Sequence, residues 1–411
     1  MAVTTEIPWG DGSGDKLYFT YPEASGSQTI SVSSDANGGV GRTKVVTFIA
    51  SHGGQTITRT LTIFQETGMD LVSITYNDVC ITYDDTAIAY PYAEEYIVFV
   101  DSVVEQICAT NWGDGTGIKP SQAAQVTNSQ FGTTFRGNTQ ITSFNEFLYF
   151  TGITYISQGA FNGCTSLEEI TFPNTVAGMG NQVFVNAGLT SFTFPESLQN
   201  NTTAFVQLFN NCKSLVSVYG LENIKLGNYC FTGAGVMSEV HVSSLEGFCK
   251  NSFTAESGTP FYSSSAVTRG LYVNNTLVTD IVIPNTITSL NAYLFRNNNT
   301  ITSVIIPSSV TSIGVSALQF CTSLTYVEIG SACDTIDAAA FYFVGTTTNK
   351  CTFVLRPVSP PTLANTNAFT ANRINKIYVP NGTLSAYQSA TNWSNFASYM
   401  AELDTNGNIP T

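Results

Sequence analysis

The chain has few charged residues, which make up 11% of its 411 positions, and basic residues are the scarcer kind. Its 15 Lys and Arg against 29 Asp and Glu give a formal net charge of −14. Nucleic-acid phosphates and anionic membrane surfaces repel such a chain, and its basic residues form no cluster that would offset the repulsion. The composition therefore predicts no nucleic-acid partner.

The sequence also has no run of about 18 apolar residues, so it predicts no membrane-spanning helix and no membrane insertion. Its first residues, MAVTTEIPWGDGSGD, contain neither the basic nor the apolar segment of a secretory signal. No signal peptide is visible in this sequence. We expect that export uses another route or that a signal was removed beforehand.

Groups suited to catalysis are scarce. The histidines are His52 and His241, and the motifs HExxH, GxSxG and CxxC are absent. The glycine-rich stretches GDGSGD (10–15) and GDGTG (113–117) lack the Lys-Ser/Thr of a phosphate-binding loop and are interpreted as turns. Acid–base catalysis needs converging groups, and nothing in the pattern indicates convergence. We expect no enzymatic activity and no cofactor.

Apolar residues are present in quantity, at 43%, and they recur with a period. An aromatic residue or Leu precedes a turn of small residues every 22–28 positions within each of two groups. Proline residues that close short apolar strands follow the same period. Such a period predicts a solenoid of leucine-rich-repeat type. The anchors are Phe161, Phe184, Phe209, Phe231, Phe295, Leu318, Phe341 and Phe369.

Within one unit, Leu324-Thr-Tyr-Val-Glu-Ile329 alternates apolar residues with others, as a strand with one buried face does. The segment SSVTSIGVSALQFC (308–321) turns the chain back, and we expect it to place Val310, Ile313, Leu318 and Phe320 inward. One coil cannot bury its own apolar edge, so coils must stack, and their strands then form parallel sheets.

The nine cysteines are an odd count, too few for a disulfide scaffold. Cys164, Cys212 and Cys321 follow their anchors by three positions, in a column that other coils fill with Ala, Asn or Val. The coils of Cys164 and Cys212 are two strand spacings apart, which is beyond disulfide reach. We interpret these cysteines as buried free thiols.

The phrases IPSSVTSIGVSALQFCTSLTYVEI (306–329) and AFNGCTSLEEITFPNTV (160–176) resemble the BspA-type leucine-rich repeats of gut and oral bacteria and their phages. LYVNNTLVTDIVIPNTITSL (271–290) resembles a longer unit of that family, whereas residues 244–270 fit the repeat poorly. IYVPNGTLSAYQSATNWSNFASYMAEL (377–403) resembles its C-terminal closure, and helical spacing there predicts a cap broken near Asn392.

Residues 1–68 contain short alternating strands separated by Gly, Asn, Ser and Asp, which indicates an antiparallel sandwich. They resemble BACON domains, immunoglobulin-like modules of Bacteroidota proteins and their phages, and the resemblance implies a spacer or a carbohydrate binder. In residues 69–149, YIVFVDSVVEQICATNW (96–112) predicts a strand and a short helix.

The loop 113–127 resembles a shortened EF-hand or dockerin-like loop, in which Asp114 is the weak calcium candidate. Calcium needs about six or seven oxygen ligands, and Asp114 is the loop's one carboxylate. We therefore expect a capped turn and no metal site.

The fold class predicted is mostly β: a β-sandwich (1–68), an adaptor (69–149), a repeat solenoid of parallel stacked strands (150–379) and a C-terminal helical cap (380–411). Solenoids bind along an extended face, so outward strand positions are the candidate site. These are Glu169, Ser217, Tyr219, Glu239, His241, Asp280, Tyr326, Glu328, Lys376 and Tyr378.

The leading functional hypothesis is a non-enzymatic recognition protein whose solenoid face binds a protein or glycan on a cell surface. The family resemblance implies adhesion, in an extracellular or cell-surface location or as a phage virion appendage. One alternative is a carbohydrate-binding protein that acts through the N-terminal sandwich. Another is a structural assembly subunit.

Overall fold

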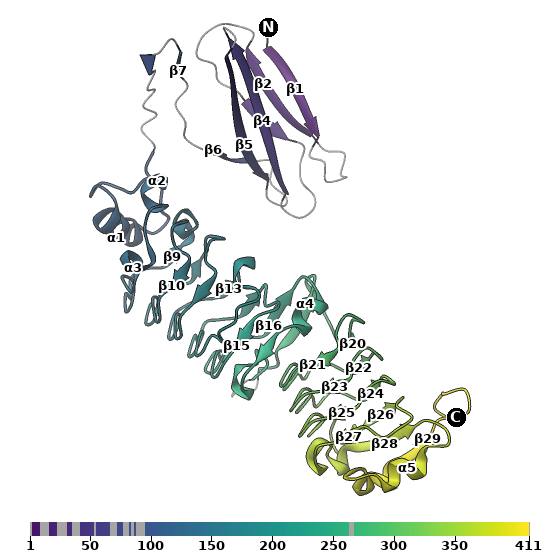
Figure 1. The fold of residues 1–411 in the computed structure, drawn as a ribbon. Coiled ribbons are helices and arrows are strands. Elements are labelled where there is room, and N and C mark those ends of the chain that lie inside the picture. Colours follow the sequence, from purple (N-terminus) through teal and green to yellow (C-terminus); the bar gives the residue numbers. More distant parts are fainter. Residues whose placement is uncertain are drawn as a thin grey trace. The chain divides into compact units, whose positions relative to one another are not determined.

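The computed structural model describes residues 95–262 and 267–410 in full and, of residues 1–94, the backbone of strands β1–β8. The chain divides into two compact units, Met1–Tyr92 and Ala93–Thr411 (Figure 1).

The strands of the first unit pair in antiparallel fashion. One sheet contains β1 (Ala2–Pro8), β2 (Lys16–Pro22) and β3 (Ser31–Ser34), and another contains β4 (Arg42–His52), β5 (Gln55–Gln65) and β6 (Val72–Tyr76). A short hairpin joins β7 (Thr82–Tyr83) to β8 (Thr86–Ala87). The side chains here lie outside the described residues, so the sandwich over 1–68 stays a prediction.

The second unit is a stack of coils whose strands line up in two rows (Figure 1). In the first row the strands of successive coils are parallel and in register, as the two-residue alternation predicts. Its members are β9 (Ser143–Phe144), β11 (Glu169–Ile170), β13 (Ser191–Thr193), β14 (Ser217–Tyr219), β16 (Glu239–Val242), β18 (Gly270–Val273), β20 (Asp280–Val282), β22 (Ser303–Ile306), β24 (Tyr326–Ile329), β26 (Cys351–Leu355), β28 (Ile374–Val379) and β29 (Met400–Glu402).

The second row is built from two-residue strands that are also parallel. Its members are β10 (Tyr155–Ile156), β12 (Gly178–Met179), β15 (Lys225–Leu226), β17 (Ser252–Phe253), β21 (Ser289–Leu290), β23 (Ser312–Ile313), β25 (Thr335–Ile336) and β27 (Thr362–Leu363). The mostly parallel, stacked architecture that the period predicted is thereby confirmed.

The phenylalanine anchors form a column inside the stack. The rings of Phe161 and Phe184, and those of Phe184 and Phe209, stack with centroids 5.6 Å apart and interplanar angles of 11° and 3°. Phe231 continues this column, and Phe135 precedes it with its ring 5.7 Å from that of Phe161. The anchors of the second group are buried as well. The predicted alignment is confirmed, and the column begins before residue 150.

Backbone hydrogen bonds also join successive coils at these anchors, in addition to those within the two rows of strands. The amide of Phe184 donates to the carbonyl of Leu208, and that of Leu318 donates to Ala340. Residues two positions before and after an anchor have positive φ at every anchor except Phe369, as at Ser316 and Phe320 around Leu318. Phe320 is only partly buried and its ring lies 5.2 Å from the guanidinium of Arg296, outside the core, so the expectation that Phe320 points inward is wrong. Ala317 is buried in this turn.

The cysteines are buried free thiols at all eight positions that the structure describes, which confirms the interpretation. Three of them donate a hydrogen bond back to the carbonyl of the preceding anchor residue: Cys164 to Phe135, Cys212 to Phe184 and Cys321 to Phe295, at 2.9–3.1 Å. The column therefore links neighbouring coils without any covalent bond.

Burial makes these thiols poor nucleophiles, because desolvation disfavours the thiolate. It raises the pKa of Cys164 to about 11 and that of Cys212 to about 12. We expect a disulfide reagent at pH 8 to label at most one of the nine cysteines of the native chain, Cys80, which lies outside the described residues. All nine should react in guanidinium chloride. Rapid labelling of several native thiols, counted by absorbance, would contradict this burial.

The first row divides into separate sheets, and the division between the larger two lies after β18. There the chain forms a hairpin with β19 (Thr276–Leu277), and the next sheet starts at β20. Residues 244–270 contain α4 (Leu245–Cys249), β17 and the 3-10 helix η3 (Glu256–Gly258). Because β17 pairs with β15, this segment belongs to the stack.

Side chains bridge the two sheets at this division. The rings of Phe248 and Phe295 lie 5.6 Å apart, and Arg296 forms a 2.9 Å ion pair with Glu256. The amide of Asn291 donates to the carbonyl of Asn251 at 2.8 Å. The apolar core is therefore continuous across the division.

Short helices close the N-terminal end of the stack, where a solenoid needs a cap. They are α1 (Ser102–Trp112), α2 (Pro120–Ala123), α3 (Asn128–Phe131) and the 3-10 helix η1 (Asn145–Tyr149). The predicted helix in 96–112 is confirmed, but the predicted strand before it is wrong. Ile97 and Phe99 are buried in alternation, but residues 96–99 form no strand, and the Ile97 amide donates to the carbonyl of Ile118 at 2.9 Å.

At the C-terminal end, α5 (Leu384–Ser389) and the 3-10 helix η6 (Trp393–Tyr399) lie against the last coil. Asn392 between them has a φ of 66°, which confirms the predicted break. Trp393 is buried, and its Nε1 donates to the carbonyl of Pro361 at 2.7 Å. The remaining 3-10 helices are η2 (Glu196–Leu198), η4 (Thr366–Ala368) and η5 (Ala371–Arg373).

Candidate functional site

The outward side chains of the first row form two columns that run along the stack. In the first column Ser191, Ser217, Glu239 and Gly270 are register partners, and so are Asp280, Ser303, Tyr326, Thr352 and Lys376. In the second column Thr193, Tyr219, His241 and Tyr272 are partners, followed by Val282, Ile305, Glu328, Val354 and Tyr378. We call these strand positions the sheet face.

Glu169 lies in β11, which pairs with β9 in a separate two-stranded sheet, and the other candidate residues lie on the sheet face, but they are not equally accessible. Glu169 and Asp280 are exposed, and Lys376 and Tyr378 are half-buried. Ser217 is buried, so its expected accessibility is wrong; its register partners in the column are Ser191 and Glu239. Ser217 therefore contributes to packing between strands.

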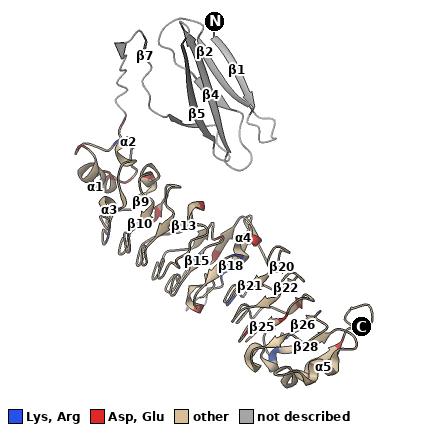
Figure 2. Ribbon diagram, viewed as in Figure 1, with Lys and Arg blue, Asp and Glu red and all other residues tan. Residues whose placement is uncertain are grey.

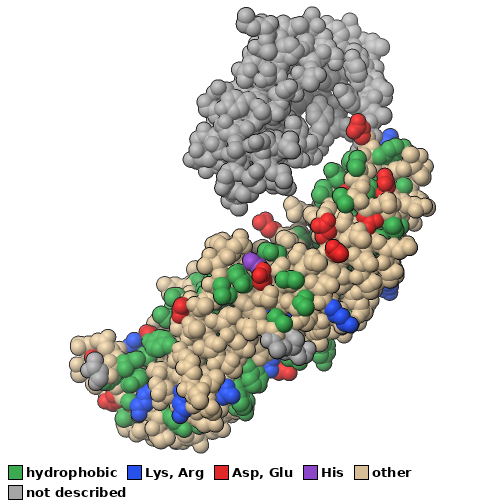
Figure 3. Space-filling view, turned by 180° about the vertical axis from the view of Figure 1, so that it is seen from behind, with side chains coloured by type: hydrophobic (Ala, Val, Ile, Leu, Met, Phe, Trp, Pro, Cys, Tyr) green, Lys and Arg blue, Asp and Glu red, His purple; other side chains and the backbone are tan. Residues whose placement is uncertain are grey.

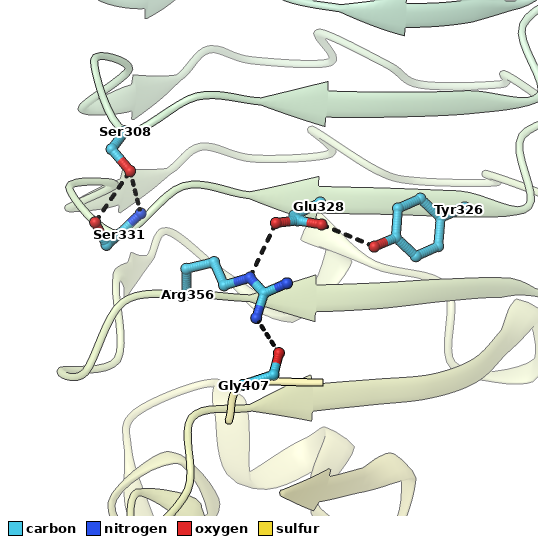
Figure 4. A network of polar contacts seen from close by, with 6 residues as sticks. All are labelled: Ser308, Tyr326, Glu328, Ser331, Arg356 and Gly407. Carbon is cyan, nitrogen blue, oxygen red and sulfur yellow. Dashed lines mark hydrogen bonds and ion pairs between the residues drawn. The ribbon is translucent and has the colours of Figure 1, made fainter. Parts of the chain in front are cut away.

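The candidates Tyr326 and Glu328, in the sheet that starts at β20, contact each other, and Glu328 also contacts Arg356 (Figure 4). The Tyr326 hydroxyl donates to Glu328 Oε2 at 2.8 Å, and Arg356 Nε donates to Glu328 Oε1 at 2.9 Å. Burial alone would raise the pKa of Glu328, but hydrogen bonds from Arg356 and Tyr326 hold it below its usual range. Since Arg356 also donates to the carbonyl of Gly407, this group ties the C-terminal segment to the stack.

The start of the second sheet combines charge with exposed apolar surface. Hydrogen bonds from Ser303, Thr279 and Thr302 lower the pKa of Asp280. Beside it in the second column, Val282 is 60% exposed and Ile305 is 38% exposed. Adjacent exposed apolar side chains on a sheet are a feature of surfaces that bind other proteins.

Aromatic rings stack along the second column of the first sheet. The His241 ring lies between those of Tyr219 and Tyr272, at centroid distances of 4.5 and 4.7 Å. Its Nε2 is 3.0 Å from Glu239 Oε2, and its Nδ1 is 3.1 Å from Asn275 Oδ1. Sequence reasoning missed Tyr272, which lies in the strand of the longer variant unit. We call Tyr219, His241 and Tyr272 the aromatic ladder.

A cavity of about 360 Å³ opens at the ladder, lined by the ends of β13, β14 and β16 and by residues of the loops that follow them. Its lining includes Thr193, Glu196, Tyr219, Glu222 and His241. In Figure 3 the histidine, purple, lies beside red acidic and green hydrophobic side chains. The volume is at the lower end of the range of small-ligand sites.

Another cavity, of about 480 Å³, lies beside β15 and contains Lys225 and Lys250 in its lining. Both ammonium groups are already engaged. Lys225 donates to the carbonyl of Thr202, and Lys250 pairs with Glu246 at 2.7 Å. The 360 Å³ cavity at the aromatic ladder is therefore the stronger candidate for a binding site.

Charge is distributed unevenly along the stack (Figure 2). Residues 95–262 contain twelve Asp and Glu against five Lys and Arg, whereas residues 267–410 contain six of each. The aromatic ladder begins in the acidic part. This excess of negative charge favours a basic partner for this part of the face.

The carboxylate of Asp114, the calcium candidate, already accepts hydrogen bonds from its own loop and from Tyr96. It accepts hydrogen bonds from the Tyr96 hydroxyl at 2.6 Å and from the amide of Thr116 at 3.0 Å. Among the fully described residues, no group of three His, Cys, Asp or Glu could hold a metal ion. Within that same part of the chain, no helix is long and apolar enough to cross a membrane.

The comparisons with known proteins identify the repeat. Residues 133–259 and 267–397, more than half of the chain, match the BspA type leucine rich repeat region in six copies. The chain therefore belongs to the BspA-type leucine-rich-repeat family. No curated protein matches it.

Several solved structures resemble the chain. The pneumococcal vaccine antigen PcpA is 12% identical with a TM-score of 0.33, covering 56% of this chain and 66% of that one, slightly less than two thirds. A leucine rich cell surface protein of Faecalibacterium prausnitzii is 16% identical, with coverage of 63% and 81% and a TM-score of 0.33. A leucine-rich repeat protein of Bacteroides ovatus is 16% identical, with coverage of 66% and 86% and a TM-score of 0.26.

Proposed function

We propose that this chain is a non-enzymatic adhesion protein whose sheet face binds a protein on a cell surface. The carrying observation is the exposure of apolar side chains in register on that face, above all Val282 and Ile305. Solenoids use such extended sheet surfaces for recognition. Exposed apolar area rimmed by polar groups gains free energy when a partner covers it.

The N-terminal unit serves as a BACON-like spacer that holds the solenoid away from its point of attachment. The protein works outside the cell, on a bacterial surface or as an appendage of a phage virion. The resemblance of residues 1–68 to such modules and the family of the repeat support this setting.

The test uses the full chain, fluorescently labelled, and intact cultured epithelial cells analysed by flow cytometry. The double variant Val282→Asp/Ile305→Asp should lose at least about tenfold in binding, because two charges replace apolar contacts. Its matched control, Val315→Asp/Val358→Asp, changes two exposed valines off the sheet face, which are 37% and 73% exposed. Melting by circular dichroism verifies that both variants are folded.

Treatment of the cells separates the alternatives. Trypsin should abolish binding and periodate should preserve it if the partner is a protein. Loss after periodate would favour a glycan bound by the N-terminal unit, and self-association in the ultracentrifuge without cell binding would favour a structural assembly subunit. Equal loss in the face variant and its control would refute the sheet face as the binding surface.

A further inference from the structure

The aromatic ladder has an uncovered end. Its rings follow the register Tyr219, His241, Tyr272, and each covers a face of the next. The position before Tyr219 in the same column is Thr193, which is exposed and too short to cover a phenol ring. One face of Tyr219 therefore borders the 360 Å³ cavity, whose lining includes both residues.

The charge around this open ring is negative. Glu196 lies on the cavity wall and is exposed, and among the described residues no hydrogen bond or ion pair engages its carboxylate. Glu222, also on the wall, accepts a hydrogen bond from the amide of Ser244 at 3.3 Å. Neither Lys nor Arg occurs among the described residues that line the cavity.

From this geometry we infer that the cavity is a subsite for an arginine side chain of a basic, extended segment in the protein partner; the inference rests on the proposed function. A guanidinium is planar and weakly hydrated, so it stacks on an aromatic face while it pairs with a carboxylate. Tyr219 supplies the ring and Glu196 the counter-charge.

The surroundings fit such a segment. The acidic excess of residues 95–262 attracts a basic chain before contact, and this attraction weakens as salt screens it. Further along the stack, Leu277 of β19 and then Val282 and Ile305 of the second column are exposed and offer apolar contacts to residues that flank the arginine. The subsite therefore fixes one end of a partner that lies along the face.

The experiment measures the fluorescence anisotropy of a labelled Gly-Arg-Gly-Arg-Gly peptide titrated with the full chain at low ionic strength. The comparison peptide contains citrulline, which has the shape of arginine but no charge. The arginine peptide should bind at least about tenfold more tightly. Equal affinity for the two peptides would overturn the proposal.

Variants place the subsite at the cavity. Thr193→Tyr extends the ladder and covers the open ring, and Glu196→Gln removes the counter-charge; each should weaken the arginine peptide about tenfold. Asp334→Asn removes one exposed charge just before β25 in the second row and should have little effect. An equal loss with Asp334→Asn, or no loss with Glu196→Gln, would refute the site.

Failure of the arginine subsite and failure of the sheet face as the adhesion surface give different results. If cells still bind the Thr193→Tyr chain as strongly as the parent while the arginine and citrulline peptides bind alike, the subsite fails and adhesion by the sheet face stands. If Val282→Asp/Ile305→Asp leaves cell binding intact, the sheet face itself fails.

Discussion

Replacing Phe209 by Ala is expected to lower the free energy of unfolding by about 3–5 kcal/mol, because it opens a cavity in the middle of the anchor column. The Phe209 ring is fully buried and stacks at 5.6 Å on both Phe184 and Phe231. It also meets Phe192 at 5.0 Å. Guanidinium chloride unfolding followed by circular dichroism measures the loss.

The control is Val216→Ala. Val216 is 41% exposed and precedes β14, close to Phe209 in sequence but outside the core. Its truncation should change stability by no more than about 0.5 kcal/mol. If Phe209→Ala were as mild, the coils would be held together mainly by backbone hydrogen bonds and not by the aromatic column.

Arg269→Met is expected to cost about 2–4 kcal/mol, because it leaves buried backbone carbonyls without donors. The Arg269 side chain is 2% exposed. Its guanidinium donates to the carbonyls of Pro260, Tyr262 and Ala234 at 2.6–2.8 Å. Burial lowers the pKa of Arg269 to about 10, so the group stays charged at neutral pH.

Arg269→Lys tests the geometry of this contact. A single ammonium cannot hold three carbonyls in the arrangement that a planar guanidinium reaches, so Lys should restore only part of the lost stability. Lys250→Met is the control, because Lys250 is 47% exposed and forms only an i,i+4 pair with Glu246. Full stability in Arg269→Lys would show that the charge alone suffices, contrary to this prediction.

The period of the sequence predicted the parallel stack, the anchor column, the buried thiols and the outward columns. Each follows from a single coil repeated, because stacking places equivalent positions beside one another. The start of the stack was harder to predict. Phe135 and β9 precede residue 150, yet their coil is flanked by α3 and η1 and lacks the repeated phrase.

Features that depend on turns or on contacts between different coils were not predictable. Phe320 lies outside the core in a turn with two left-handed residues, and the sequence pattern does not encode that turn. Tyr272 joins the ladder only because β18 pairs with β16 across the irregular segment between them. The cavity needs the loops after β13 and β14 to bring Glu196 and Glu222 to the same wall as Tyr219, which alternation alone does not specify.

The coils around β22 suggest how proteins of this kind change their reach. Asp280, Ser303 and Tyr326 are register partners separated by 23 residues each, and the backbone bonds on either side of β22 repeat the same pattern. Removing or duplicating one such unit preserves the match between the flanking coils. Insertion or deletion of one 23-residue unit in the gene would therefore lengthen or shorten the recognition surface by one coil and leave the two capping ends unchanged.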